Sequence, residues 1–220
     1  MPTPTSSSTY IPALGYHWLT PLYDLVVGAT TRERTFKRAL IAQARLESHH
    51  RVLDLACGTG TLTIWAKQAT PSAEITGVDS DPAVLGLAEK KRTAAGVQVR
   101  FDHALSTALP YANGQFDRIL SSLFFHHLKP AEKHRTALES FRVLKPGGEL
   151  HIADWGQPAN PLMRALFISI RMLDGFANTR DHANGKLPEF FLSAGFHRVE
   201  ETARFNTIYG TLALYRAARP

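Results

Sequence analysis

The chain has 220 residues, of which 44% are hydrophobic and 20% charged, and it contains 12 Phe, 6 Tyr and 3 Trp. This composition excludes a disordered chain and a collagen-like one, and the length suits one large folded domain. The formal net charge of +6 is spread along the chain rather than gathered in a basic stripe, so we expect no nucleic-acid partner.

The single cysteine, Cys57, excludes an intrachain disulfide and a cysteine-rich zinc site, and it fits a reducing compartment. The sequence has no apolar run of about 18 residues, and its first residues lack the charged and apolar regions of a secretory signal. We therefore expect a cytoplasmic protein without stable membrane insertion. Peripheral contact with a membrane stays open.

The N-terminal quarter is expected to cover the rest of the domain. Residues 1–10 are rich in Pro, Ser and Thr and are predicted to be disordered. Aromatic and apolar residues then lead into a helical pattern near 32–46, where Phe36, Leu40 and Ala44 share one face. Residues 11–50 are thus predicted to form N-terminal helices that pack on the remainder of the chain.

Residues 51–155 alternate short apolar runs with helical patterns, which is typical of β/α units around a mostly parallel sheet. Strands are predicted at 52–56, 75–78, 97–101, 116–120 and 149–155. The intervening helices begin after a Gly-rich turn, at Asp81-Pro82 and at Pro130, and the last one is expected to stop at Pro146-Gly147-Gly148.

The remaining residues depart from this rhythm. Residues 156–186 are predicted to form a helical insert, within which 159–174 has the spacing of an amphipathic helix. Its apolar face suits core packing, a lid over an apolar substrate or contact with a membrane; it consists of Leu162, Met163, Leu166, Phe167, Ile170 and Leu173. Residues 187–220 are predicted to add a short helix near 187–194 and two strands, 196–202 and 205–216, that form an antiparallel hairpin at the sheet edge.

One strand-turn-helix unit, R-V-L-D-L-A-C-G-T-G-T at 51–61, carries the clearest functional signal. Gly58 and Gly60 lie where a ligand must approach the backbone closely, because glycine has no Cβ. Asp79 ends the next strand, where an acid can bind both hydroxyls of a ribose. Together these residues predict an adenosine-type ligand over the carboxyl ends of the strands.

The next two positions of interest separate the common adenosine cofactors. The third glycine of a dinucleotide fingerprint would fall on Thr63, which disfavours an NAD-linked oxidoreductase. Asp54 precedes the glycines and suits a ligand that carries an ammonium group, whereas it would repel a pyrophosphate. The pattern therefore favours S-adenosylmethionine.

Six short motifs also occur in a fixed order. They are L-D-L-A-C-G-T-G at 53–60, G-V-D-S-D at 77–81, L-P-Y at 109–111, F-D-R-I-L-S-S at 116–122, H-H-L at 126–128 and R-V-L-K-P-G-G at 142–148. Together they resemble the class I S-adenosylmethionine-dependent methyltransferases, in particular the ubiquinone/menaquinone-biosynthesis and type-11 branch. The resemblance implies a single α/β domain over 11–220 with a cofactor-binding core at 51–155. It also implies a Rossmann-like seven-stranded sheet in the order 3-2-1-4-5-7-6, with strand 7 antiparallel and helices on its faces.

The resemblance implies a set of cofactor-binding residues as well. Asp54, Ala56, Gly58 and Gly60 would surround the methionine part, Asp79 would bind the ribose, Ser80 would lie beside the adenine, Ser121 near the transferring methyl, and Tyr23 would close over the cofactor. The acid expected beside the adenine amino group falls on Leu105. Asp102 is the substitute, or backbone groups around 104–106 hold the adenine.

Two histidines follow the fourth strand on the side expected to face the methyl group. His126 and His127 have the pKa range of a general base, which phenols and carbon acids need, and structural hydrogen bonding is their alternative role. We expect no metal, because these adjacent rings should point apart. The predicted acceptor is a small molecule with an apolar body, such as a quinone precursor or a lipid, and the predicted cofactor product is S-adenosylhomocysteine.

Three other functions stay open at this point. A catalytically inactive S-adenosylmethionine-binding regulatory protein would keep the same loop, and Leu105 slightly favours it. A nucleic-acid methyltransferase fits the basic charge, but no base-pocket motif follows the fourth strand. The NAD-linked alternative conflicts with Thr63, and either a monomer or a homodimer is compatible with the chain.

Overall fold

The computed structural model describes residues 32–220. Their helices and strands, in chain order, are α2 (Glu33–Ala44), β1 (Arg51–Leu55), α3 (Thr61–Ala69), β2 (Glu74–Asp79), α4 (Pro82–Ala95), β3 (Arg100–His103), β4 (Phe116–Ser122), the 3-10 turn η2 (Phe125–His127), α5 (Pro130–Val143), β5 (Leu144–Trp155), α6 (Pro161–Asp174), α7 (Phe176–Ala183), α8 (Leu187–Ser193), β6 (His197–Thr207) and β7 (Gly210–Ala218). The predicted disorder at 1–10, the expected helices before residue 32 and Tyr23 lie outside the described residues.

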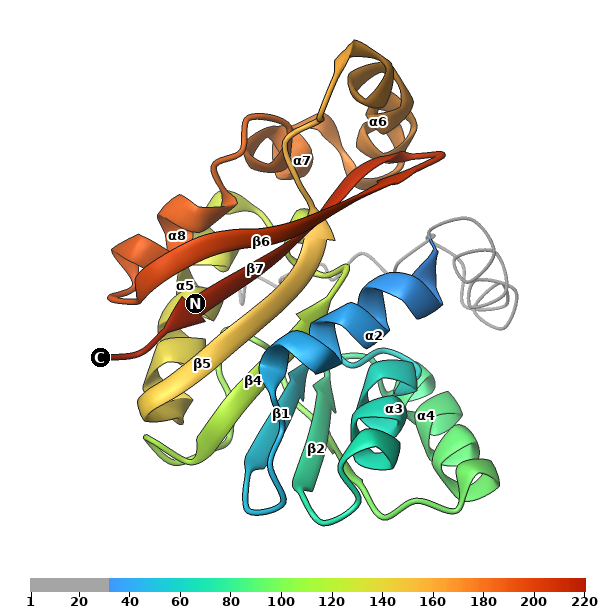
Figure 1. The fold of residues 1–220 in the computed structure, drawn as a ribbon, viewed down its shortest axis with the longest axis vertical. Helices are drawn as coiled ribbons and strands as arrows, with labels where there is room; N and C mark the ends of the chain where they lie inside the picture. Colours follow the sequence, from blue (N-terminus) through green and yellow to red (C-terminus); the bar gives the residue numbers. More distant parts are fainter. Residues whose placement is uncertain (1–31) are drawn as a thin grey trace, which may run out of the picture.

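The strands form one seven-stranded sheet in the order β3-β2-β1-β4-β5-β7-β6 (Figure 1). Strands β1 to β5 pair in parallel, whereas β7 runs antiparallel to its neighbours β5 and β6. The predicted fold class and strand order are thus confirmed. Because parallel strands end at the same edge, the segments that come after β1, β2, β4 and β5 gather there.

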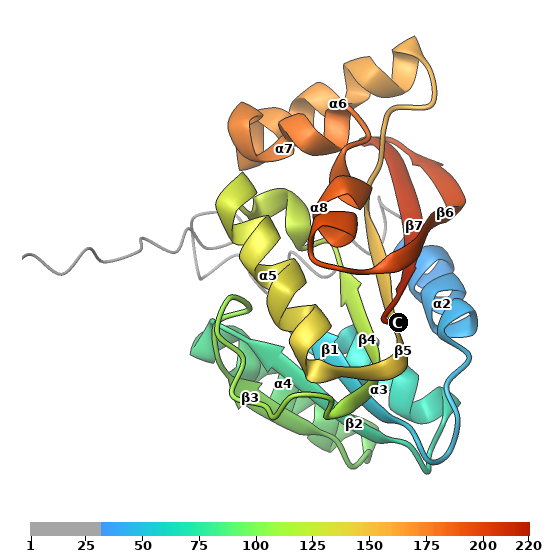
Figure 2. The same ribbon diagram turned by 90° about the vertical axis from the view of Figure 1, so that its left-hand side faces the viewer.

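Successive side chains of the buried strands reach opposite faces of the sheet. Val52 belongs to the core beneath α2 and α3, which includes Phe36 and Leu62. Its neighbour Leu53 belongs to the core beneath α5 and α8, which includes Phe191. Figure 2 shows α5 and α8 on one side of the sheet and α2 on the other. The sheet is therefore the middle layer of three, each face buried by helices.

Local sequence signals explain where two of the helices begin. Asp81 caps α4, because its side chain accepts the backbone N–H groups of Ala83 at 2.8 Å and Val84 at 3.4 Å, and Pro82 occupies the first turn. Asn160 caps α6 through the backbone N–H of Met163 at 2.9 Å. The predicted start at Asp81-Pro82 is confirmed.

Several element boundaries differ from the predicted ones. Strand β5 begins at Leu144 rather than 149, because Leu144 already pairs with Phe116 before an irregular step in the ladder. Strand β6 continues to Thr207, although the sequence predicted that this strand ends at 202. The irregularity at that point is a register shift in the β6–β7 pairing, between Glu201 and Ala203, and not the end of the strand. Strand β3 spans Arg100–His103 instead of 97–101. Helix α7 was not predicted as a separate helix within the insert.

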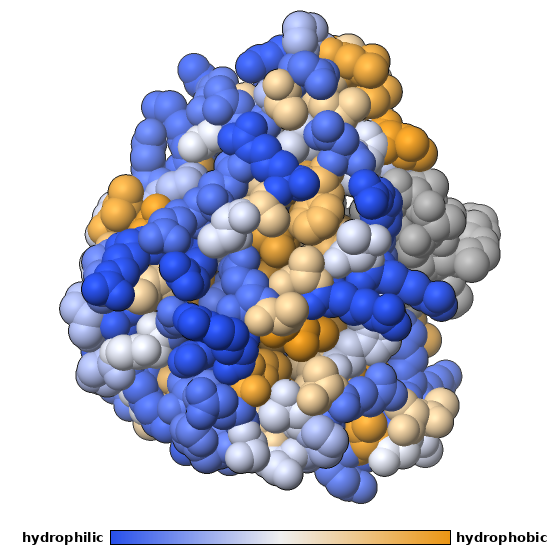
Figure 3. All heavy atoms as spheres, viewed as in Figure 1, coloured by the Kyte–Doolittle hydropathy of each residue, from blue (hydrophilic) through white to orange (hydrophobic). Residues whose placement is uncertain are grey.

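The amphipathic helix α6 is confirmed, and its apolar face is core only in part, with Ile170 half-buried against the core. Only Met163 and Phe167 are buried in it. Leu162, Met172 and Leu173 are 63%, 72% and 71% exposed, and Figure 3 shows hydrophobic surface over α6 at the upper right. None of the helices in residues 32–220 is long and apolar enough to cross a membrane.

Candidate active site at the carboxyl edge of the sheet

The loop after β1 is built from residues in the left-handed backbone region. Ala56, Gly58 and Gly60 have φ angles of 56°, 55° and 75°. A Cβ on Gly60 would lie 2.7 Å from Cζ of Phe101, so internal packing requires that glycine. A Cβ on Gly58 would meet nothing within 4 Å. The loop therefore leaves open space beside the Gly58 backbone, where a ligand can approach.

Asp79, the last residue of β2, fastens this loop to the start of α4. Its Oδ2 accepts the backbone N–H of Gly58 at 2.8 Å, and its Oδ1 accepts that of Asp81 at 3.0 Å. Burial raises the pKa of this carboxyl in spite of both bonds. The Asp79 side chain thus lies directly against the open part of the loop.

Asp54 lies beneath the same loop and is almost completely buried. Its Oδ2 accepts a hydrogen bond of 2.6 Å from the hydroxyl of Thr63, while its Oδ1 has no hydrogen-bond partner among residues 32–220. Burial raises the pKa of Asp54 to about 7. A cationic group beside Oδ1 would satisfy the oxygen and favour its charged form. The role of Thr63 as a partner of Asp54 was not predicted.

The other predicted cofactor residues are engaged within the protein. Ser121 is fully buried and donates to the carbonyl of Leu55 at 2.9 Å. Asp102 accepts the hydroxyl of Tyr111 at 2.9 Å and pairs with Arg100 at 3.0 Å. Ser80 is half-buried, and its carbonyl lies 3.0 Å from Nε2 of His103. Direct contacts of Ser80, Asp102 and Ser121 with a cofactor therefore stay predictions.

A second group of functional side chains lies after β4 and β5; we call it the histidine cluster, and it comprises His126, His127, Asp154, Asp174 and His182. Asp154 is its buried centre. Its Oδ1 lies 2.6 Å from Nδ1 of His126 and accepts the backbone N–H of Trp155 at 2.7 Å. Burial alone would raise the pKa of Asp154, but His126 and His182 hold it well below its usual range. Asp154 is thus an anionic anchor for the His126 ring.

Asp174, at the end of α6, brings both neighbouring histidines together. Nδ1 of His127 lies 3.1 Å from its Oδ1, and Nε2 of His126 lies 3.6 Å from its Oδ2. The two ring centroids are 4.0 Å apart. The prediction that the rings of His126 and His127 point apart is therefore wrong, because both turn towards one carboxylate.

Helix α7 closes the back of the cluster. His182 is fully buried, its Nε2 lies 3.8 Å from Oδ1 of Asp154, and neither ring nitrogen has a hydrogen-bond partner among residues 32–220. Burial lowers the pKa of His182 to about 3. The buried Lys133 of α5 pairs with Asp181 at 3.0 Å, and Asn178 donates to the carbonyl of His127 at 3.0 Å. These contacts tie α7 to the histidine turn.

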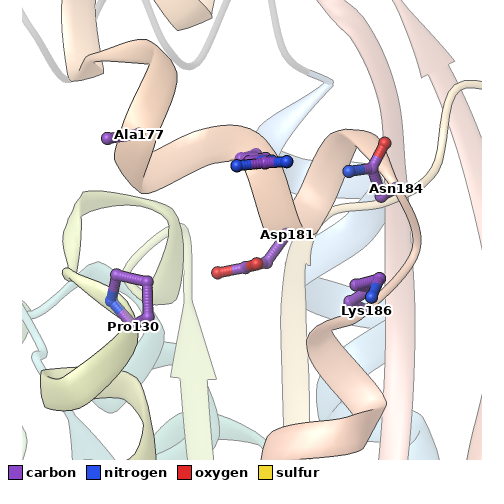
Figure 4. A pocket seen from close by; sticks show the side chains of 6 residues that line it. Pro130, Ala177, Asp181, Asn184 and Lys186 are labelled. Carbon is purple, nitrogen blue, oxygen red and sulfur yellow. The ribbon is translucent and has the colours of Figure 1, made fainter.

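A hollow of about 380 Å³ lies on the outer side of α7. It is lined by Pro130, Ala177, Arg180, Asp181, Asn184 and Lys186. Figure 4 shows Pro130 on one side of it and Asp181, Asn184 and Lys186 on the other. None of the predicted site residues lines this hollow, and its Asp181 is already paired with Lys133.

Asp174 and His182 were not identified from the sequence. Each lies on an element far along the chain from His126, and nothing in their local sequence indicates a partner there. Asp154 falls near the carboxyl end of the fifth strand predicted at 149–155, and the sequence does not indicate its histidine partners. The sequence offers one usable signal for Asp174, which is its position at the end of the amphipathic helix, between the apolar Leu173 and Gly175.

Comparisons with known proteins show similarity to methyltransferases. A methyltransferase domain matches residues 52–148. The demethylmenaquinone methyltransferase of Deinococcus radiodurans is 36% identical over 151 residues, 68% of this chain and 62% of that protein. Its counterpart from Thermus thermophilus is 37% identical over 146 residues, 64% of each chain. The chain thus spans less than two thirds of the length of these two relatives.

A third relative aligns over more of its length. The ubiquinone/menaquinone biosynthesis C-methyltransferase of Ectopseudomonas mendocina is 28% identical over 228 residues, 93% of this chain and 87% of that protein. Among solved structures, the [4+2]-cyclase SpnF has a TM-score of 0.71 at 18% identity and covers 94% of both chains. The YcgJ protein of Bacillus subtilis has a TM-score of 0.69 at 18% identity, over 83% of this chain and 97% of that one. At these identities the structures confirm the fold.

Proposed function

The chain belongs to the class I S-adenosylmethionine-dependent methyltransferases of the ubiquinone/menaquinone-biosynthesis type, and we propose that it transfers a methyl group from S-adenosylmethionine to a small, quinone-related acceptor. One observation carries this proposal. The open loop held by Asp54 and Asp79 and the histidine cluster lie at the same edge of the sheet, after β1 and β2 and after β4 and β5. A cofactor and an acceptor can therefore meet there.

The residues of the loop fit this cofactor. The unpartnered Oδ1 of Asp54 suits the ammonium group of the methionine part. The open space at Gly58 suits close approach of the ligand to the backbone, and Asp79 is placed to bind the ribose hydroxyls. When bound, the cofactor supplies a methyl group on a sulfonium whose leaving group is neutral. The protein then has mainly to position the acceptor and exclude water.

The acceptor side combines a polar centre with apolar surroundings. His127 is the more accessible of the two histidines, with a side chain 29% exposed against 4% for His126. Asp174, which contacts both rings, directly follows the exposed Leu173 and lies two residues before the exposed Phe176. We infer that an ionisable oxygen of the acceptor lies against the histidines and that its apolar body lies along α6. The names of the relatives support an acceptor with a quinone-type ring.

Calorimetric titration with S-adenosylmethionine, S-adenosylhomocysteine and NAD tests the cofactor half. We expect micromolar binding of the first two and none of NAD. Asp79→Asn should weaken binding, whereas Asp117→Asn should not, because Asp117 lies near the opposite end of β4 and binds Lys145. Binding of NAD, or equal losses in both variants, would contradict the assignment.

A thermodynamic cycle that combines Asp79→Asn with an altered ligand separates the ribose contact from the support that Asp79 gives to the loop. If Asp79 binds the ribose, Asp79→Asn should cost about 1–3 kcal/mol with S-adenosylhomocysteine and clearly less with its 2′,3′-dideoxy analogue. Equal losses with both ligands would leave Asp79 only a structural role in the loop.

Turnover tests the acceptor half. When the protein is given S-adenosylmethionine and a reduced naphthoquinone with a short prenyl tail, it should form S-adenosylhomocysteine and a methylated quinol. Both products are measured by mass spectrometry. A regulatory protein would bind the cofactor and never turn over; Leu105 slightly favours that alternative, whereas the similarity to methyltransferases does not support it. Turnover with single-stranded DNA or RNA in place of the quinol would contradict the proposed acceptor class.

A further inference from the structure

We propose that the histidine cluster holds one divalent cation of the zinc class, with His126, His127 and Asp174 as its three protein ligands. The site itself rests on the geometry of these residues. Its role at the acceptor rests on the proposed function. It also replaces the expectation that no metal is present, which depended on rings that point apart.

The distances between the ligand atoms suit one small cation. One ligand atom from each of His126, His127 and Asp174 lies within 4.8 Å of the other two. Nε2 of His126 lies 3.6 Å from Oδ2 of Asp174, and Nδ1 of His127 lies 3.1 Å from its Oδ1. Zinc binds nitrogen and oxygen ligands at about 2.0–2.2 Å, so two tetrahedral ligands are about 3.4 Å apart. The observed distances lie on either side of that value.

The surroundings of His126 match those of a metal-bound histidine. Its Nδ1 lies 2.6 Å from the buried Asp154, so Nε2, which faces Asp174, is left to bind a cation. Nε2 is 3.6 Å from Asp174, longer than a hydrogen bond. Histidines that bind metals almost always donate their other ring N–H to a carboxylate or carbonyl, which fixes the ring and its tautomer.

The charge of the site also suits a dication. Imidazoles that bind a metal are neutral, so a dication held by both histidines would balance the two carboxylates of Asp154 and Asp174. The nearby cation of Lys133 is already paired with Asp181. Two histidines and one carboxylate leave a fourth position open, as in catalytic zinc sites.

The open position indicates how the site would serve the reaction. His127 is the most accessible of the three ligands, so the fourth position lies on the side that an acceptor can reach. A hydroxyl oxygen of the acceptor bound there would release its proton to water more readily, because the cation stabilises the oxyanion. The two histidines would then act as ligands rather than as general bases.

A second group of three potential ligands serves as an internal control. Glu47, His49 and His50 also lie close enough to hold an ion, but Glu47 and His49 are largely exposed. Nδ1 of His50 already accepts the backbone N–H of Glu47 at 3.1 Å. No buried carboxylate within hydrogen-bond distance orients this group among the described contacts. We therefore expect it to bind a cation much more weakly.

Metal titration of the full chain tests the proposal without any acceptor. Protein freed of metal by a chelator should bind about one equivalent of Zn²⁺ in calorimetry, and Co²⁺ should give the visible absorption of a four-coordinate site. Asp174→Asn and His127→Gln should each weaken Zn²⁺ binding at least about tenfold. Asp154→Asn, which removes the carboxylate that orients His126 but none of the three proposed ligands, should weaken it about 10- to 100-fold. His49→Gln should change nothing.

Three results would overturn the proposal: no stoichiometric Zn²⁺ binding, equal losses in Asp174→Asn and His49→Gln, or an unchanged affinity in all three cluster variants. Circular dichroism and thermal melting of each variant exclude unfolding as the cause of a loss. Cofactor titration of the metal-free protein separates this proposal from the proposed function. If the metal-free protein binds the cofactor normally and transfers methyl groups at the full rate, the proposed role of the cation is excluded. The methyltransferase assignment is then unaffected.

Discussion

Asp54 and Thr63 show how a departure from one motif can support another. Thr63 stands where a dinucleotide fingerprint would have its third glycine, and its hydroxyl instead fixes one oxygen of Asp54. The other oxygen is buried without a partner in the described part of the chain. The pair therefore presents a single acceptor atom whose burial cost a cationic ligand can relieve.

This arrangement predicts a pH-dependent cofactor affinity. Burial raises the pKa of Asp54 to about 7, so the group is mostly protonated below neutral pH. The ammonium group of the ligand favours the ionised form, and binding should therefore release a proton. We expect the affinity for S-adenosylhomocysteine to rise up to about tenfold per pH unit between about pH 5.5 and 7. The amine of the ligand stays protonated throughout this range.

Calorimetry in buffers of different ionisation enthalpy measures both the affinity and the proton release. Asp54→Asn should bind more weakly and lose this pH dependence. If the variant keeps the slope of the unaltered protein, the titrating group is a different one.

Ala56 gives a prediction for the apo protein. It has a φ of 56°, a region in which a Cβ costs about 1–2 kcal/mol and glycine costs nothing. Glycine also makes the unfolded chain more flexible, which offsets about 0.5–1 kcal/mol of the gain. Ala56→Gly should therefore raise the free energy of unfolding by up to about 1 kcal/mol, measured by urea denaturation. Ala165→Gly, in the exposed middle of α6, should lower it by about 0.5–1 kcal/mol. A loss at Ala56 as large as that at Ala165 would mean that the loop is not strained.

The residues of the two halves of the site differed in how well the sequence could predict them. Asp54, Gly58 and Asp79 lie within a short span and belong to motifs with fixed spacing, and the structure brings them together around one loop. Asp174 and His182 reach the histidines only because α6 and α7 fold back over η2. Such long-range contacts leave no periodic signal in the chain.

Helix α6 illustrates the same limit for an element. Its apolar spacing predicted the helix, but spacing alone does not tell which apolar side chains have a partner. Phe167 packs against Trp155, with ring centroids 5.7 Å apart, and fastens the helix to the sheet. Met172 and Leu173, one turn and more beyond it, are left exposed next to Asp174. The existence of the buried strands was easier to predict, because buried strands are apolar on both faces.

The exposed end of α6 predicts an effect on the acceptor. Replacing Met172 and Leu173 by Ser should raise KM for a quinol with a prenyl tail at least about fivefold, because apolar contact area is lost. The KM for a tailless quinol and the free energy of unfolding should change little, since both side chains are more than 70% exposed. Ile208→Ser, at an exposed site in the β6–β7 turn, is the matched control and should leave both KM values unchanged. An equal rise of KM for both quinols would exclude a contact between α6 and the tail.

At the scale of the whole molecule, the predicted strand order is confirmed, while its stabilising contacts were not predictable. The order came from the resemblance to a family, and the terminal hairpin from the absence of a helix between two β-like runs. Arg219, just after β7, donates to the carbonyls of Phe141 at 3.0 Å and Arg142 at 3.2 Å, and also to that of Leu144. It thereby satisfies carbonyls at the end of α5 and links the residues after β7 to α5 and to the start of β5.

This contact predicts a stability effect far from the site. Arg219→Ala should lower the free energy of unfolding by about 1–3 kcal/mol, because three carbonyls lose a charged donor. Arg216→Ala removes an exposed ion pair with Glu200 and should cost no more than about 1 kcal/mol. Urea denaturation of both variants makes the comparison. Equal losses would mean that Arg219 contributes only as a surface charge.

The position of β7 between β5 and β6 also has a consequence for protein synthesis. Strands β2 to β5 can each pair as they leave the ribosome, because each has a neighbour that has already been made, beginning with β1. Strand β6 emerges before β7, its pairing partner, and has to wait for it. Helix α6 can pack on Trp155 of β5 as soon as it is made, but the contact between Phe167 and Gly210 forms only when β7 emerges. A nascent chain can therefore complete the edge that receives the cofactor well before Asp174 is carried to the two histidines.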